Sequence, residues 1–314
     1  IFKKKQSLSD LLHIIVDNPK RVSINDMKQH VKTLRVALSQ ITTPNVEVEN
    51  FIQLFYSLNA FGTFISIIDT LDSDSRKDIV TILSFFVRRK MNGFIAKDDE
   101  VIPLISYIKK NPQIIKIFIE KLQGHDIALT YGQILQDMTK SQDLAEMILK
   151  FLGDDNFKHI FEAMKSNEFD ISSEACILLN ELLTKHQSLT QEFLALNRGF
   201  LEQLFQLVTT ENYATRRFVL QTVGDLLLNK QNFDVMLDFV KSDQNLRNIM
   251  LALRDQTQTI RKEAFQIFKI FVACPDKSDQ VAKILKKNKD KLVQFLEELK
   301  LEQNCEEEKQ YIIE

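Results

Sequence analysis

Apolar residues recur along most of the chain at the spacing of an amphipathic helix. In the segment 259–273, TIRKEAFQIFKIFVA, six of the apolar side chains fall at i, i+4, i+7, i+8, i+11 and i+12 from Ile260. These positions share one face of a helix with 3.6 residues per turn. Pro275 follows closely and is a helix stop. The pattern therefore predicts a helix over 259–273 that buries one face.

This helical pattern repeats along the chain. The segment 170–186, DISSEACILLNELLTKH, aligns with 214–230, ATRRFVLQTVGDLLLNK, and the segments near 72–90, 125–141 and 259–275 follow the same pattern. The equivalent apolar position is, in chain order, Leu83, Leu135, Leu179, Val223 and Phe268. A period of about 40–47 residues is typical of armadillo or HEAT repeats. We therefore expect an all-α, armadillo/HEAT-like solenoid that forms one domain over 1–314, and a further helix in the acidic tail 302–314.

The composition agrees with helices and excludes several kinds of active site. The chain of 314 residues has only 7 glycines and 5 prolines. No two glycines lie within seven residues of each other, so the Gly-rich loops that cradle phosphates or dinucleotides and the G-x-S-x-G elbow are absent. The sequence therefore supports an enzyme less well than a non-catalytic binding protein.

Charge, hydropathy and cysteine spacing narrow the class of protein further. The net charge is -2, without the basic excess that general nucleic-acid binding needs. No apolar stretch approaches the length of a transmembrane helix, so we expect no membrane insertion. The odd number of widely spaced cysteines, Cys176, Cys274 and Cys305, predicts no disulfide framework. We expect a cytoplasmic protein and a monomer.

No metal or cofactor site is expected. The five histidines are scattered, without the pairing that a metal requires. The segment DSDSR at 72–76 starts like a calcium loop, but Lys77 and Leu83 stand where such a loop needs Gly and Glu. It is interpreted instead as the N-cap of the following helix.

Two basic clusters have both a structural and a functional interpretation. Arg216 and Arg217 open a repeat helix, where the helix dipole disfavours cations, and their equivalents one repeat earlier are Ser172 and Ser173, candidate N-caps. They are either solvated or contact a partner. The second cluster is either an exposed helix end or a rim for an acidic peptide, and it comprises Lys283, Lys286, Lys287, Lys289 and Lys291.

Three long segments resemble a known family. The segments 169–186, 211–233 and 260–277 are closely similar to the calcium-binding protein 39 family, and weaker similarity extends over 7–152. The resemblance implies a right-handed horseshoe of helical repeats without catalytic activity. It also implies a scaffold that binds sterile-20-type protein kinases or a related pseudokinase and holds the kinase domain in its active conformation.

The resemblance also implies two contact regions. A pocket in the C-terminal repeats would take a Trp-Glu-Phe motif from the partner's tail, and its implied residues are Met250, Leu253, Lys287 and Lys291. A concave face would meet the kinase domain, with implied residues Arg217, Tyr213 and Phe169. The residues by themselves leave open that Met250 is core, and that the protein is a helical-repeat adaptor for an unrelated partner.

Overall fold

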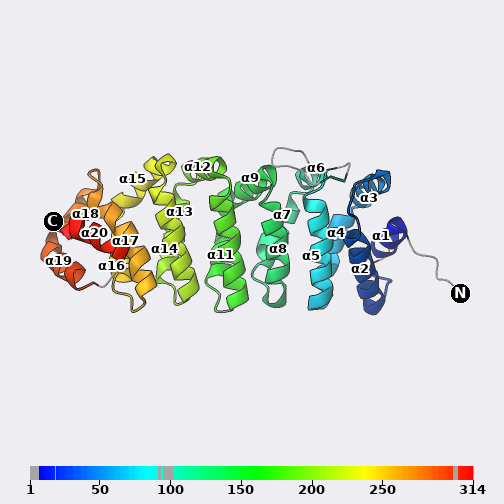
Figure 1. Cartoon of the computed structure of the whole chain (residues 1–314), viewed down its shortest axis with the longest axis horizontal. Helices are drawn as coiled ribbons and strands as arrows, with labels where there is room; N and C mark the ends of the chain where they lie inside the picture. Colours follow the sequence, from blue (N-terminus) through cyan, green and yellow to red (C-terminus); the bar gives the residue numbers. More distant parts are fainter. Residues whose placement is uncertain (1–6, 18, 91–92, 95–101, 300–302, 314) are drawn as a thin grey trace. The chain divides into compact units, whose positions relative to one another are not determined.

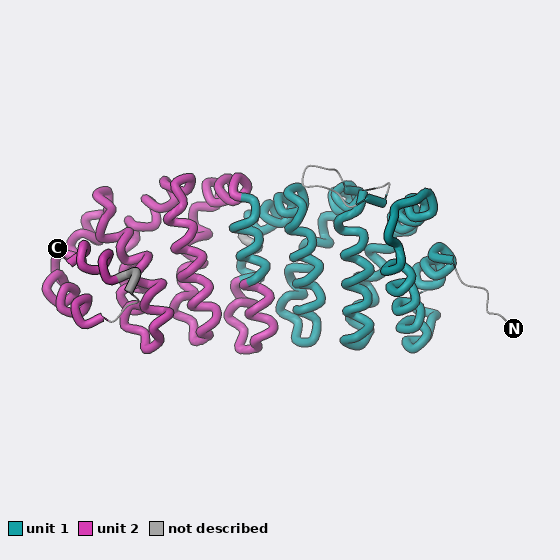
Figure 2. The backbone as a smooth tube through the Cα atoms, in the orientation of Figure 1, with its two compact units in different colours: residues 1–160, 177–186 teal, residues 161–176, 187–314 magenta. Residues whose placement is uncertain are grey.

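The computed structural model describes residues 7–17, 19–90, 93–94, 102–299 and 303–313, which form two compact units (Figures 1 and 2). The first unit contains residues 1–160 and 177–186, and the second contains 161–176 and 187–314. Each unit is described separately. The expectation of one domain over 1–314 stays a prediction.

The first unit contains nine complete α-helices within its described residues. They are α1 (Leu8–Val16), α2 (Ile24–Ser39), α3 (Val46–Ser57), α4 (Ala60–Ile68), α5 (Ser73–Val87), α6 (Pro103–Lys110), α7 (Gln113–Lys121), α8 (Ala128–Met138) and α9 (Gln142–Phe151). A short 3-10 helix, η1 (His125–Ile127), precedes α8, and a π-helical turn, η2 (Leu152–Asn156), follows α9. Helices α10 (Phe157–Met164) and α11 (Phe169–Thr184) contribute residues to both units.

The second unit contains a further nine complete α-helices within its described residues. They are α12 (Gln187–Leu196), α13 (Gly199–Gln206), α14 (Tyr213–Leu228), α15 (Phe233–Lys241), α16 (Asp243–Ala252), α17 (Gln258–Ala273), α18 (Asp279–Lys287), α19 (Lys289–Glu298) and α20 (Gln303–Ile313). The 3-10 helices η3 (Leu207–Thr209) and η4 (Lys230–Asn232) lie before α14 and α15. The helices expected over 259–273 and in the acidic tail are confirmed as α17 and α20.

Equivalent helices of consecutive repeats pack side by side within each unit. In the first unit α2 contacts α5, and α5 contacts α8; in the second, α14 contacts α17 (Figure 1). All five apolar positions that the repeat alignment made equivalent are buried, namely Leu83, Leu135, Leu179, Val223 and Phe268. Each repeat buries its apolar face against its neighbours, which is the packing of a solenoid. The expected all-α solenoid is therefore confirmed.

Side-chain caps fix where several helices begin. Asp72 caps α5, because its side chain accepts a hydrogen bond of 3.0 Å from the Ser75 amide. Lys28 forms an ion pair of 2.6 Å with Asp72, and this cation, together with the hydrogen bonds from Ser75, lowers the pKa of the carboxyl. The interpretation of 72–76 as an N-cap is confirmed.

The expected N-caps of α11 are wrong. Helix α11 begins at Phe169, so Ser172 and Ser173 lie inside its first two turns and do not cap it. The Ser172 hydroxyl lies within hydrogen-bond distance of the carbonyls of Glu168 and Phe169, at 3.2 and 3.3 Å. His186 lies beyond the end of α11, and its Nε2 is 2.8 Å from the carbonyl oxygen of Thr139, which follows α8. It therefore contacts the end of the preceding repeat's helix.

Candidate functional site

Two exposed aromatic side chains occupy equivalent positions in neighbouring repeats. Phe169 is the first residue of α11 and Tyr213 is the first residue of α14, and both belong to the second unit. Phe169 is 70% exposed and Tyr213 is 41% exposed. Large exposed aromatic side chains are common anchors of protein interfaces. The structure thus places two of the sequence-derived contact residues at matching helix starts.

The start of α14 is tied to α11 and to the turn before it. The Asn212 side chain accepts a hydrogen bond of 3.2 Å from the Thr215 amide and donates to the Ser172 hydroxyl at 3.1 Å. The buried Thr215 hydroxyl donates to the Met164 carbonyl at 2.7 Å. Because these bonds join two adjacent helix starts, they hold Phe169 and Tyr213 on the same end of the second unit's repeats.

The two arginines that open α14 have different surroundings. The Arg216 guanidinium is half-buried and forms an ion pair with Asp255, in the turn before α17. Arg217 is exposed and forms no ion pair among the residues that the structure describes. The unfavourable position of Arg216 in the helix dipole thus has a structural explanation, and Arg217 is the residue of the pair that is free to contact a partner.

Asp255 is surrounded by donors. Burial would raise its pKa, but hydrogen bonds from Thr257 and the Arg216 guanidinium together lower the pKa below the ordinary range of an aspartate. The Thr257 amide donates to Asp255 at 2.8 Å. Arg261 Nη1 donates to the backbone carbonyls of Asp255 and Gln256, each at 2.9 Å. This turn is therefore held by two arginines from different helices.

The four residues implied for a peptide pocket lie on three elements of the second unit. Met250 is half-buried near the end of α16, and Leu253, directly after this helix, is 1% exposed. Lys287 ends α18 and Lys291 lies in the first turn of α19, and both lysines are exposed. Helix α16 contacts α18. The packing of Leu253 makes it part of the interior, so Met250 is the apolar member with surface to offer a ligand.

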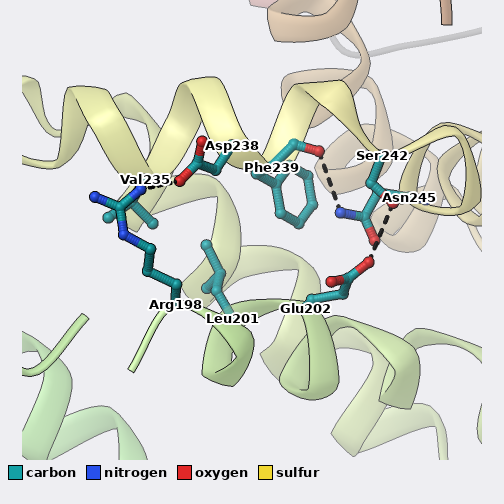
Figure 3. A pocket seen from close by; sticks show the side chains of 8 residues that line it. All are labelled: Arg198, Leu201, Glu202, Val235, Asp238, Phe239, Ser242 and Asn245. Atoms are coloured by element: carbon teal, nitrogen blue, oxygen red, sulfur yellow. Dashed lines mark hydrogen bonds and ion pairs between the residues drawn. The ribbon is translucent and has the colours of Figure 1, made fainter. Parts of the chain in front are cut away.

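Three hollows in the second unit are lined by residues other than the four implied for the peptide pocket. The smallest, of about 70 Å³, lies between α13 and α15 and is bridged by two polar contacts (Figure 3). Arg198 pairs with Asp238 at 2.5 Å, and the Ser242 hydroxyl donates to Glu202 at 3.2 Å. Because its charged groups are already paired, this hollow offers few free groups to a ligand.

The two larger hollows flank the C-terminal half of α17. One, of about 430 Å³, is walled by the exposed side chains of Leu228 and Phe233 among others. The other, of about 680 Å³, lies against α20 and includes Tyr311, which is 82% exposed. The sequence analysis did not identify these exposed apolar residues. The pattern of apolar positions along a helix is the same whether or not a neighbouring element covers the residue at its end.

Metal-ligating side chains do not gather into a cluster among the described residues. Within them no group of three His, Cys, Asp or Glu side chains could hold a metal ion. Cys176 is buried, and burial raises the pKa of its thiol to about 12, although a contact of 4.0 Å with the Thr215 hydroxyl opposes the shift. Cys274 is also buried, and the side chain of Cys305 lies outside the described residues.

Among the described residues, no helix on its own has the length and apolar character to cross a membrane. Helices α3 and α4 meet that test only when taken together, and they are bent by 66°.

Comparison with known proteins gives consistent matches over nearly the whole chain. The family model described as Mo25-like matches residues 3–314. The chain is 29% identical to a calcium-binding protein 39-like protein of Mus musculus, covering 99% of this chain and 94% of that one. It is also 29% identical to a Mo25-like protein of Schizosaccharomyces pombe, covering 94% and 90%.

A solved structure matches the fold alone. The crystal structure of an engineered protein has a TM-score of 0.50 to this chain with 10% sequence identity. The match covers 99% of this chain and 77% of the other.

Proposed function

Because this chain belongs to the Mo25-like family, we propose that it is a non-enzymatic scaffold that binds and allosterically activates sterile-20-type protein kinases or a related pseudokinase. The similarity to calcium-binding protein 39-like and Mo25-like proteins supports a scaffold role. The proposal includes action in the cytoplasm as a monomer. It has two parts, a face for the kinase domain and a pocket for the partner's tail.

The observation that carries the proposal is the exposure of Phe169, Tyr213 and Arg217 at the starts of α11 and α14. Interfaces are typically anchored by aromatic and arginine side chains. Here two exposed aromatic rings lie at matching helix starts, together with a guanidinium that has no ion pair within the described part of the chain. The bonds of Asn212 and Thr215 hold these helix starts in place before a partner arrives, which lowers the entropy cost of binding.

Activation follows from binding to one conformation of the kinase. A protein kinase is active only when its αC helix brings a glutamate to the catalytic lysine. A scaffold surface that contacts αC in that position, and not in others, shifts the population towards the active state. The proposed role of Arg217, Tyr213 and Phe169 is to make this contact.

The second part of the proposal is capture of a Trp-Glu-Phe tail near α16, α18 and α19. Met250 would contact the aromatic side chains, and methionine adapts well to such groups. Lys287 and Lys291 are exposed and would pair with the motif's carboxylates. Leu253 would support the pocket from within, since its own side chain is buried.

The alternative is a helical-repeat adaptor for an unrelated protein. It would keep the same fold, but binding would not depend on Met250 or Arg217. The two functions therefore differ in a result that can be measured.

A titration with a labelled peptide that ends in Trp-Glu-Phe separates them. Binding at micromolar or lower concentration that is lost in Met250→Ala supports the kinase scaffold. The matched control is Met236→Ala, another half-buried methionine outside the proposed pocket, which should bind the peptide normally. Absence of peptide binding by the unaltered protein, together with kinase activity that Arg217→Ala leaves unchanged, would favour the unrelated adaptor.

A further inference from the structure

The turn between α1 and α2 carries a pair of cations just before a serine. Lys20 and Arg21 lie three and two residues ahead of Ser23, in the sequence KRVSI. Among all serines and threonines of the chain, only Ser7 and Ser23 have cations at both of these positions. Protein kinases select their substrates partly by the pattern of charge around the hydroxyl. The pattern therefore indicates a substrate for a protein kinase.

The structure leaves the side chains around this serine accessible. Residues 19–21 form a turn, and Lys20, Arg21 and Ser23 are exposed. Ile24, which follows the serine, is 56% exposed although its side chain is large and apolar. Neither cation forms an ion pair with any residue that the structure describes. A second protein can therefore contact the serine together with its neighbours on both sides.

The backbone at Ser23 suits an extended substrate. Its φ of -62° and ψ of 151° are extended, and α2 begins only at the next residue, Ile24. Only this first helical residue would have to leave α2 for the segment 20–24 to lie extended in a groove. Helix ends open at a small cost in free energy. A kinase could thus bind the segment while the rest of α2 stays folded.

Capping of α2 accounts for the serine but not for the residues around it. The Ser23 hydroxyl accepts a hydrogen bond of 3.1 Å from the Asp26 amide and donates to the Asp26 carboxylate at 2.7 Å. An N-cap requires neither cations before it nor an exposed apolar residue after it. Ser242 caps α16 in the same way, and the residues three and two before it are Phe239 and Val240.

We propose that Ser23 is a phosphorylation site for a basophilic protein kinase, that is, a kinase whose substrate groove carries carboxylates. These carboxylates would pair with Lys20 and Arg21, and an apolar pocket would take Ile24. The Ser23 Oγ attacks the γ-phosphorus of ATP, a new O–P bond forms, and the bond from this phosphorus to the β–γ bridging oxygen breaks. ADP leaves, and the hydroxyl proton passes to the catalytic aspartate of the kinase.

Phosphorylation would change the charge of the turn without unfolding α2. A phosphoserine carries about -1.5 to -2 charges at pH 7, which offsets the two cations of the segment 19–24. Repulsion from the Asp26 carboxylate opposes the modification, whereas the helix dipole favours an anion at a helix start. The phosphate oxygens can also accept the hydrogen bond that the Asp26 amide now donates to the hydroxyl.

The test uses the full chain, ATP with Mg²⁺, and the catalytic subunit of cAMP-dependent protein kinase as a basophilic probe. Peptide mass spectrometry locates each phosphate. We expect phosphate at Ser23 in the native protein and none at this position in Ser23→Ala. Arg21→Ala should lower the rate at Ser23 by about tenfold or more, because one charged contact with the kinase is lost. The matched control is Lys32→Ala, at an exposed lysine of α2 beyond the serine, which should keep the rate.

A second serine of the same unit is the internal control. Ser73 is exposed at the start of α5, but no cation lies three or two residues before it. It should stay unmodified. Equal rates at Ser23 and Ser73, modification of Ser23 only after denaturation, or an unchanged rate in Arg21→Ala would overturn the inference. Ser7 is scored separately, because the cations before it lie outside the described residues.

The effect on the fold is measured on the phosphorylated protein. Circular dichroism should show the same helix content before and after modification, and a loss of helix would contradict a change of charge alone. The inference is independent of the proposed function, which concerns residues of the second unit. Failure of either one therefore leaves the other standing.

Discussion

The carboxylate of Asp255 accepts the charge-assisted hydrogen bond of Arg216, which lies 39 residues earlier in the chain. The pair joins the start of α14 to the turn before α17, and it leaves the adjacent Arg217 exposed. One ion pair thus distinguishes a structural arginine, Arg216, from the exposed Arg217, to which the proposed function assigns partner binding. This relationship leads directly to the first prediction.

Replacing Asp255 should destabilise the second unit more than replacing Arg217. Asp255→Ala removes the acceptor for both Arg216 and the Thr257 amide and leaves a half-buried guanidinium unpaired. We expect a loss of about 1–3 kcal/mol in the free energy of unfolding. Urea denaturation followed by circular dichroism measures it. Arg217→Ala is the matched control and should change stability by less than about 0.5 kcal/mol; equal losses would contradict the structural role of the pair.

The Asp255 contribution should depend on pH in a defined direction. Its pKa is lowered in the folded protein, so its stabilisation is complete above the unfolded-state pKa of about 3.9 and is lost as pH falls through the folded-state value. The stability difference between the unaltered protein and Asp255→Ala should therefore be constant at neutral pH and shrink below about pH 4. A difference that grows on acidification would show that the pair has another role.

A buried and an exposed phenylalanine provide a test of the repeat core. Phe268 fills the equivalent core position of α17, whereas Phe169 is exposed at the start of α11. Phe268→Ala should cost about 3–5 kcal/mol, because it leaves a cavity in a packed interior. Phe169→Ala should change stability by no more than about 0.5 kcal/mol. Guanidinium denaturation of both variants gives the comparison, and similar losses would contradict the assigned burial.

The exposed aromatic residues should matter for binding and not for folding. Under the proposed function, Phe169→Ala and Tyr213→Ala should each weaken binding of a sterile-20-type kinase domain by about tenfold or more, as interface anchors do. Isothermal titration calorimetry measures the change. Leu196→Ala is the control, since Leu196 is also strongly exposed in the second unit but lies in α12. If all three variants bind alike, the proposed kinase face lies elsewhere.

Cys176 should resist alkylation in the folded protein. Its thiol is buried, with a pKa raised to about 12, so almost no thiolate is present near pH 8. Peptide mass spectrometry after iodoacetamide treatment should find Cys176 unmodified in the native state and fully modified in denaturant. Rapid native modification would mean that α11 opens around this residue.

The family resemblance seen in the segments around α11, α14 and α17 is confirmed by the match of the family model over 3–314. The residues that it implied for the two contact regions stay predictions. The structure adds that Leu253 is interior, and that Arg216 has an ion pair whereas Arg217 has none with any residue that the structure describes. Sequence similarity transfers a residue's position in a repeat, but it does not show how much of its side chain reaches the surface.

The amino-acid sequence alone determined the helices, their repeat and the residues that the repeats bury. These properties depend on spacing within one or two helices, so Leu83, Leu135 and Phe268 could be assigned to the core from periodicity. Only the tertiary structure decided which polar groups are paired. Asp255 reaches Arg216, and His186 reaches the Thr139 carbonyl, across 39 and 47 residues. Such contacts depend on how neighbouring repeats pack against each other, and no local pattern of residues specifies that.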